Sequence, residues 1–203
     1  ISADPALTAR MLKVVNSAFY GLPRQIASIN RAVSLLGLNA VKNIAIAASL
    51  AKLFRGGSVG PHFDAHHLWA HSCATAAAAR TVANASGRKG VADEAFLAGL
   101  LHDIGKMAVP QDLLDKPGKL TDGEFAAVRK HPEEGGNILI ASKQVSALVL
   151  DVCLHHHEKI DGSGYPHRLQ GEQISLLAKM GAGCSKDGGW VNGQVLRANG
   201  GFA

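Results

Sequence analysis

Helical spacing of apolar residues is the feature that most restricts the fold of this 203-residue chain. Apolar side chains recur every three or four residues, as on the buried face of an amphipathic helix. In the first fifty residues these positions are Leu7, Met11, Val14, Val15, Ile29, Val33, Leu36, Val41 and Ile44. No segment shows the alternation of apolar and polar residues that is typical of a half-buried strand. The sequence therefore predicts an all-α fold.

Capping and helix-breaking residues indicate where the first helices begin and end. Asp4 and Pro5 form an N-cap followed by a proline at the first helical position. The segments Tyr20–Pro23 and Leu36–Asn39 interrupt the helical pattern. Three or four short helices are therefore expected before residue 53.

Longer helices are predicted in the second part of the chain. They cover residues 66–85 and 92–106, and two acidic residues near the start of the second complement the helix dipole. Thr121 and Glu124 have the spacing of a capping box ahead of another helix. An apolar helix is predicted over residues 145–154.

Composition divides the chain into three parts. Gly56–Pro61 combines flexible residues with a proline and is the best candidate for a linker. We expect a small helical region over residues 1–56 and a larger helical domain over residues 57–180. Residues 181–203 contain seven glycines and little periodicity, so no packed helix is expected there.

The charge pattern limits the partners that this chain can bind. Its formal net charge is +5, which favours an anionic ligand. The lysines and arginines are scattered, however, and no aromatic residues are interleaved with them as in RNA-binding proteins. We therefore expect no DNA or RNA polymer as a partner.

Cysteine usage and hydropathy indicate the compartment. Cys73, Cys153 and Cys184 stand far apart without paired spacing, so neither a disulfide framework nor a cysteine metal site is expected. No apolar run approaches the roughly 20 residues that span a bilayer. These features predict a cytoplasmic chain without a membrane segment. Because it begins at Ile1, we also expect an upstream part.

An adjacent histidine and aspartate, His102 and Asp103, mark a candidate metal site. Imidazole and carboxylate together suit iron, manganese, zinc or nickel better than calcium, and one carboxylate can bridge two cations. Further imidazoles must then come from other helices, as in metal sites inside helical bundles. The candidate ligands are His71, His102, Asp103, His131, His156 and His157.

The remaining histidines are less specific. His67 lies one helical turn before His71 and is an additional candidate ligand. A solvated or hydrogen-bonded side chain is the ordinary interpretation of a single histidine, and we keep it for four of them. These are His62, His66, His155 and His167.

Two further features lie near the candidate ligands in sequence. Lys106 follows His102 by four residues, so its ammonium could hold a phosphate oxygen, although a lysine near a helix end is also common. The segment Asp161–Pro166 is rich in turn residues. It could place Tyr165 against a nucleotide base, or it could be a purely structural turn.

At these residues the chain resembles two related families of the HD superfamily. The segment from Asp4 to about Leu53 resembles the helical N-terminal part of HDOD signalling domains. The segment from about His67 to Met180, with HDIGK, HPEEGG, HHE and DGSGYP, resembles HD-GYP phosphodiesterases, which hydrolyse cyclic di-GMP. The resemblance implies an HD-domain helical bundle preceded by a smaller HDOD-like subdomain. A short stretch near residues 190–202 is similar to the end of short-chain dehydrogenases.

The resemblance to HD-GYP proteins implies roles for individual residues. It implies that the six candidate ligands hold two or three divalent metal ions, usually iron or manganese. Asp103 and Lys106 would be catalytic, and Lys106 would hold the scissile phosphate. Gly164, Tyr165 and Pro166 would belong to the loop that faces the nucleotide. The products would be linear pGpG or GMP.

Two positions depart from the pattern of that family. His67 stands where the family usually has a glutamate. Ser185 falls near the place of the last aspartate ligand, with Asp187 two residues away. Loss of a bridging carboxylate would lower the affinity of the site for metal.

Three functions are compatible with these features. The first is a metal-dependent phosphodiesterase acting on cyclic di-GMP. The second is a catalytically inactive HDOD-type signalling module that binds partner proteins, and the third is a metal-dependent nucleotidase with another substrate. A homodimer is left open by the sequence.

Overall fold

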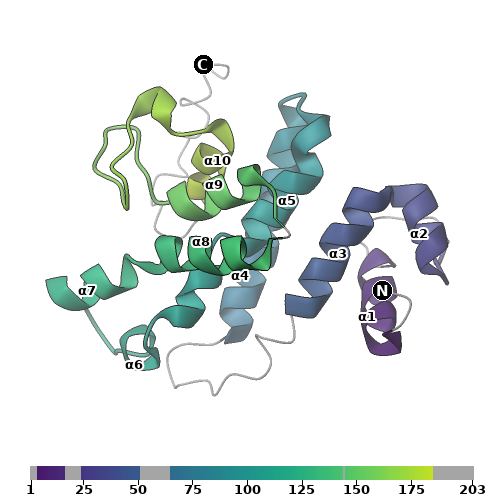
Figure 1. Cartoon of the computed structure of the whole chain (residues 1–203), viewed down its shortest axis with the longest axis horizontal. Coiled ribbons are helices and arrows are strands. Elements are labelled where there is room, and N and C mark those ends of the chain that lie inside the picture. The colour runs from purple at the N-terminus through teal and green to yellow at the C-terminus, as the bar shows by residue number, and fades with distance from the viewer. Residues whose placement is uncertain (1–3, 17–23, 51–64, 144, 185–203) are drawn as a thin grey trace. The chain divides into compact units, whose positions relative to one another are not determined.

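The computed structural model describes residues 4–16, 24–50, 65–143 and 145–184, which are coloured in Figure 1. Within these ranges the ordered elements are α-helices and short 3₁₀ turns. The only β-type pairing among the described residues is an isolated bridge between Asp161 and Gln170. The prediction of an all-α fold is therefore confirmed.

The chain separates into two compact units, Ile1–Ser58 and Val59–Ala203. The predicted linker Gly56–Pro61 and the predicted break at Tyr20–Pro23 lie outside the described residues. The predicted boundary at residues 56 and 57 therefore stays a prediction. Each unit is described by itself below.

The described residues of the first unit form the helices α1 (Pro5–Val15), α2 (Ile29–Leu36) and α3 (Leu38–Leu50). The predicted N-cap is confirmed, because Asp4 Oδ1 accepts a hydrogen bond from the backbone N–H of Leu7 at 2.9 Å. Gly37 ends α2 with a φ of 84°, a conformation that favours glycine. The apolar face of the three helices forms one core. It includes Met11, Val15, Ile26, Ala32, Val41, Ile44 and Ala48.

A side-chain clamp joins the end of α1 to the residues ahead of α2. Asn16 Nδ2 donates to the carbonyl oxygen of Ile26 at 2.9 Å, and Ile26 N–H donates to Asn16 Oδ1 at 2.7 Å. The Asn16 side-chain amide therefore makes the same pair of hydrogen bonds with the Ile26 backbone that a residue of a neighbouring β-strand would make. This contact holds Ile26, which is 6% exposed, in the core.

The second unit is built on α4 (Ala65–Ala85) and α5 (Ala92–Leu101), which run side by side (Figure 1). The predicted long helix over residues 66–85 is confirmed. A Cβ added at Gly99 would lie 2.8 Å from the backbone of Ala76, so the two helices approach too closely for a side chain there. Alanines, including Ala76 and Ala79, are buried along this contact.

The predicted helix over residues 92–106 is wrong beyond Leu101. Helix α5 ends there, and a 3₁₀ turn, η3 (Ile104–Ala108), follows. Asp103 leaves the helical region with φ of −99° and ψ of 11°. The tighter turn brings Gly105 against the backbone of His131, and this tertiary contact overrides the helical pattern.

Short helices connect this pair to the rest of the unit. They are α6 (Gln111–Leu114) and α7 (Asp122–Val128). The predicted capping box of α7 is confirmed, since Thr121 N–H donates to Glu124 Oε2 at 2.7 Å and Glu124 N–H donates to Thr121 Oγ1 at 3.4 Å. Lys116 Nζ lies 2.6 Å from Glu124 Oε2, and this ion pair with the Thr121 bonds lowers the pKa of Glu124 to about 2.

Helices α8 (His131–Ser142), α9 (Ala147–His155) and α10 (Leu176–Cys184) complete the unit. The helix predicted over residues 145–154 is confirmed as α9. The expectation of no helix after residue 180 is wrong for residues 181–184. A Cβ at Gly181 would lie 3.0 Å from Val152 Cγ1, so the glycine lets α10 pack closely on α9 and its low helix propensity is outweighed. Residues 185–203 lie outside the described residues.

Replacing Asn16 by alanine tests the clamp in the first unit. The Asn16→Ala variant loses both hydrogen bonds and leaves the amide and carbonyl of Ile26 unpaired, so its unfolding free energy should fall by roughly 2 kcal/mol. Urea unfolding followed by circular dichroism measures this change. Asn30→Ala, at an exposed position of α2, is the control and should change stability by less than about 0.7 kcal/mol. Equal stability of the two variants would contradict the role of the clamp.

Candidate metal centre

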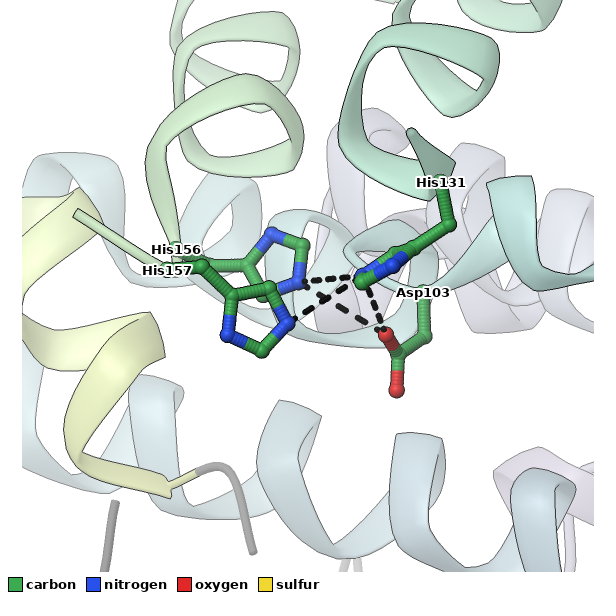
Figure 2. Close-up of side chains that lie close together, drawn as sticks. All are labelled: Asp103, His131, His156 and His157. Atoms are coloured by element: carbon green, nitrogen blue, oxygen red, sulfur yellow. Dashed lines mark hydrogen bonds and ion pairs between the residues drawn. The ribbon is translucent and has the colours of Figure 1, made fainter. Parts of the chain in front are cut away.

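Histidines from four segments of the second unit meet around Asp103. His71 projects from α4, and His102 follows the last residue of α5. His131 is the first residue of α8, while His156 and His157 follow α9 directly. Figure 2 shows His131, His156 and His157 turned towards the Asp103 carboxylate. The structure thus brings together all six residues that the sequence predicts as metal ligands.

One oxygen of Asp103 faces the first pair of imidazoles. Asp103 Oδ2 lies 3.3 Å from His102 Nε2 and 3.6 Å from His71 Nε2. The two Nε2 atoms are 3.2 Å apart. These three side chains can present their ligand atoms to a single ion.

The other oxygen faces a second group, drawn in Figure 2. Asp103 Oδ1 lies 3.3 Å from His131 Nε2 and 3.6 Å from His156 Nε2. His131 Nε2 is 3.2 Å from the Nε2 atoms of both His156 and His157. Asp103 therefore belongs to two donor groups, with one oxygen in each, as expected for a bridging carboxylate.

Backbone carbonyls set the orientation of three rings. The Nδ1 atoms of His102, His131 and His156 lie 2.8 to 2.9 Å from carbonyl oxygens of the preceding turn. A carbonyl oxygen can only accept, so each Nδ1 must carry the proton and donate. In a neutral ring this leaves the lone pair of Nε2 directed at the cluster, the arrangement that metal-binding histidines usually have.

Burial favours the uncharged form of the His156 and His157 imidazoles. Burial lowers the pKa of His156 to about 4, against the opposing effect of Asp103. Burial and the neighbouring histidines lower the pKa of His157 still further. Burial alone would raise the pKa of Asp103, but the adjacent imidazoles, His102 first, hold it well below its usual range. The cluster therefore combines an ionised carboxylate with imidazole electron-pair donors.

The donor set fits a metal ion. The Nε2 atoms of His131 and His156 face each other at 3.2 Å while the Nδ1 atom of each ring donates to a carbonyl oxygen, and Asp103 Oδ1 is buried without a hydrogen bond. Such a group is costly to bury unless a cation lies between the donors. Imidazole nitrogens with a carboxylate suit a borderline transition metal.

Lys106 lies beside the shared carboxylate. Its Nζ donates to Asp103 Oδ2 at 2.8 Å, three residues away along the 3₁₀ turn, and its side chain is 22% exposed. The ammonium therefore reaches the cluster, as the sequence predicts, and it keeps a surface open to an anionic ligand. The predicted contact with a phosphate stays a prediction.

Glycines allow the segments that carry the ligands to approach each other. A Cβ at Gly105 would lie 1.8 Å from the carbonyl oxygen of His131 and 2.5 Å from the backbone nitrogen of Gly135. A Cβ at Gly135 would lie 2.7 Å from Cys153 Sγ. The glycine of the HDIGK motif is thus required so that η3 can contact α8 next to the ligands.

The loop that follows α9 covers one side of the cluster. The Tyr165 ring stacks on His157, with ring centres 4.6 Å apart and planes inclined by 17°. Gly164 is buried, and a Cβ there would lie 2.4 Å from the backbone nitrogen of Lys159. Tyr165 N–H donates to the carbonyl oxygen of His157 at 3.3 Å, so this amide is used inside the loop. The predicted contacts of Gly164, Tyr165 and Pro166 with a nucleotide stay predictions.

Glu158 holds this loop in place, a role that sequence reasoning missed. Its carboxylate is 3% exposed and accepts hydrogen bonds from the backbone N–H groups of His167 at 2.6 Å and Leu169 at 2.9 Å. Its position directly after two ligands in the HHE motif was the available signal. The sequence could not show that the side chain turns towards the loop.

The other histidines of the described residues do not join the cluster. His155 Nδ1 lies 2.8 Å from Asp151 Oδ1, and its ring packs against His167 at a centroid distance of 5.2 Å. Asp151 also accepts a hydrogen bond from Ser175 Oγ, which joins α9 to the start of α10. His62, the side chains of His66 and His67, and residues Ser185 and Asp187 lie outside the described residues.

Comparison with known proteins identifies the family to which the chain belongs. The HDOD domain profile matches residues 1–134, which is more than half of the chain. The chain therefore belongs to the HDOD domain family. Among the described residues no helix is both long and apolar enough to cross a membrane.

Curated relatives match a more limited stretch of the chain. The cyclic di-GMP phosphodiesterase PA4108 of Pseudomonas aeruginosa is 70% identical over 91 residues, which is 45% of this chain and 22% of that protein. The cyclic di-GMP phosphodiesterase response regulator RpfG of Xanthomonas campestris is 47% identical over 88 residues, 41% of this chain and 22% of that protein. The chain thus spans about a fifth of the length of these relatives.

Solved structures share the fold. An HDOD domain protein of unknown function from Geobacter sulfurreducens has a TM-score of 0.70 at 25% identity, covering 100% of this chain and 75% of that one. Bd1817 of Bdellovibrio bacteriovorus has a TM-score of 0.53 at 18% identity, covering 76% and 54%. These neighbours and the curated relatives confirm the resemblance to HDOD domains and to cyclic di-GMP phosphodiesterases.

A side chain at Gly105 should disrupt the contact between η3 and α8. We expect Gly105→Ala to lower the unfolding free energy by about 3 kcal/mol, because the new Cβ collides with backbone atoms that cannot move freely. Chemical unfolding measures the loss. Gly123→Ala is the matched control, since nothing lies within 4 Å of its Cβ in α7, and it should be neutral or stabilising. A stable Gly105→Ala protein would contradict the close packing.

Replacing Glu158 by glutamine should loosen the loop over residues 161–170. The side-chain amide of the variant has one oxygen that can accept and one NH₂ group that cannot. One of the two hydrogen bonds from the loop backbone is therefore lost, which lowers the stability of the loop by about 1 to 3 kcal/mol. Amide hydrogen exchange of His167 and Leu169 should become faster. Glu172→Gln is the control, because the Glu172 side chain is fully exposed and 3.8 Å from Lys179. Unchanged exchange in Glu158→Gln would argue against this role.

Proposed function

We propose that this chain is a metal-dependent phosphodiesterase that hydrolyses cyclic di-GMP to pGpG or GMP. The observation that carries the proposal is the double use of Asp103, whose two oxygens face separate groups of imidazoles. A carboxylate shared by two donor groups suits two neighbouring divalent cations, the arrangement typical of enzymes that cleave phosphate esters. The names of the curated relatives support the choice of substrate.

Each residue of the site has a separate role in this proposal. His71 and His102, together with Asp103, would hold one ion, and His131, His156 and His157, again with Asp103, would hold a second. When bound, such ions supply Lewis acidity and lower the pKa of a water molecule. We favour iron or manganese and leave a third ion open.

The chain's own groups position the nucleotide. Lys106, already beside Asp103, neutralises an oxygen of the scissile phosphate as a point charge. Tyr165 and its neighbours Gly164 and Pro166 form the loop wall against which the nucleotide lies. The stack of Tyr165 on His157 keeps this wall next to the cluster.

The second candidate is a catalytically inactive signalling module that binds partner proteins. The match of the HDOD profile to residues 1–134 favours it, because this family includes domains without catalysis. Ser185 near the place of the last aspartate ligand points the same way. A nucleotidase with another substrate is a third candidate, and its site would be the same. A homodimer and a cytoplasmic location stay predictions.

Metal content and turnover of the purified protein test the proposal. We expect about two iron or manganese ions per chain and cleavage of cyclic di-GMP, both lost in Asp103→Asn, which removes the shared charge at nearly constant volume. Elemental analysis and chromatography of the products measure the two quantities. His167→Ala, whose ring lies against His155 rather than Asp103, is the control and should retain both.

The outcome separates the candidates. A folded, helical protein that binds no metal would favour the signalling module. A protein that binds metal and cleaves another nucleotide but not cyclic di-GMP would favour the nucleotidase. Retention of metal and turnover by Asp103→Asn would overturn the assignment of the site.

A further inference from the structure

Arg129 occupies an unusual position at the edge of the candidate metal centre. It follows α7 directly and precedes His131 by two residues. Its guanidinium carbon lies 4.4 Å from the ring centre of Phe125 and 5.2 Å from that of Tyr165. Tyr165 in turn stacks on His157. A continuous series of planar groups therefore links Arg129 to the cluster.

This arrangement orients the guanidinium and leaves its charge unpaired. Among the described residues Arg129 makes no ion pair, and its side chain is exposed. Cation–π contacts with the two rings use the charge of the guanidinium and leave its N–H groups available as hydrogen-bond donors. An arginine held in this way keeps its bidentate donor edge available for an anion.

The aromatic partner on α7 supports a functional interpretation. Phe125 is 40% exposed, so burial in the core does not account for its position. The contact with Arg129 accounts for the position of Phe125, because the ring limits the rotational freedom of the long Arg129 side chain at the surface. Less entropy is then lost when that side chain binds a ligand.

We propose that Arg129 binds a second phosphate group, one that is not cleaved, of the nucleotide substrate. This inference rests on the proposed function. Lys106, at the shared carboxylate, lies where the reacting phosphate would bind, whereas Arg129 lies beyond Tyr165 at the rim. We expect a substrate with two phosphates to contact both cations, whereas a phosphodiester with one phosphate would contact only one of them. Arg129 thus selects for dinucleotides.

The test compares substrates with one and two phosphates. In Arg129→Met, which keeps the stem and removes the charge, the ratio of KM for cyclic di-GMP to KM for bis(p-nitrophenyl) phosphate should rise about 10-fold or more. The kcat for cyclic di-GMP should change much less than KM. Arg129→Lys should recover only part of the loss, because it restores a charge without the planar donor edge. Lys130→Met, the neighbouring exposed cation, is the matched control.

Phe125→Leu provides a second arm that leaves the charge in place. Removing the ring frees the guanidinium, so KM for cyclic di-GMP should rise, though less than in Arg129→Met. Affinity for cyclic di-GMP is also measured with Asp103→Asn, where turnover cannot interfere. In that background Arg129→Met should again weaken binding about 10-fold.

The results separate failure of this inference from failure of the proposed function. If cyclic di-GMP is cleaved and Arg129→Met leaves both KM and affinity unchanged, the inference is wrong and the proposed function stands. If cyclic di-GMP binds and is not cleaved, the proposed function fails and the affinity series still decides the role of Arg129. An equal rise in KM for both substrates would show that Arg129 only braces Tyr165, and absence of binding would overturn both proposals.

Discussion

The buried carboxylate of Asp103 is the group around which the second unit is organised. Its oxygens face imidazoles from α4, α5, α8 and α9, so every major segment of the bundle except α10 supplies a neighbour. A charge buried in this way is unfavourable unless other groups compensate it. The compensation comes from Lys106 on the open side and from the surrounding rings. The packing of the helices therefore determines which groups surround and compensate the Asp103 carboxylate.

Close backbone approaches make this convergence possible. Gly105 brings η3 onto the first residue of α8, and Gly99 brings α5 onto α4. Cys153, inert because burial raises its pKa to about 12, fills the space beside Gly135. Small residues at these points are needed because the ligands come from different helices and must end within a few ångströms of one another. The glycines of the motifs are thus part of the site without supplying a ligand atom.

Features that depend on neighbouring residues were predicted correctly. The cap at Asp4, the capping box at Thr121 and the long helix α4 follow from neighbouring residues and agree with the structure. The helix over 92–106 and the absence of helix after residue 180 were predicted wrongly for the opposite reason. In both cases a contact between distant segments decided the backbone, and propensity within one segment carries no information about such a contact.

The sequence alone determined the all-α class and the six residues that meet in the cluster. Helical periodicity follows from the spacing of apolar residues, and ligand chemistry follows from residue type. Only the tertiary structure decided that Asp103 divides its oxygens between two groups and that Glu158 turns to the loop. It also decided that Arg129 lies over Tyr165. Side-chain direction depends on how helices pack, and packing is settled by contacts between residues far apart in the chain.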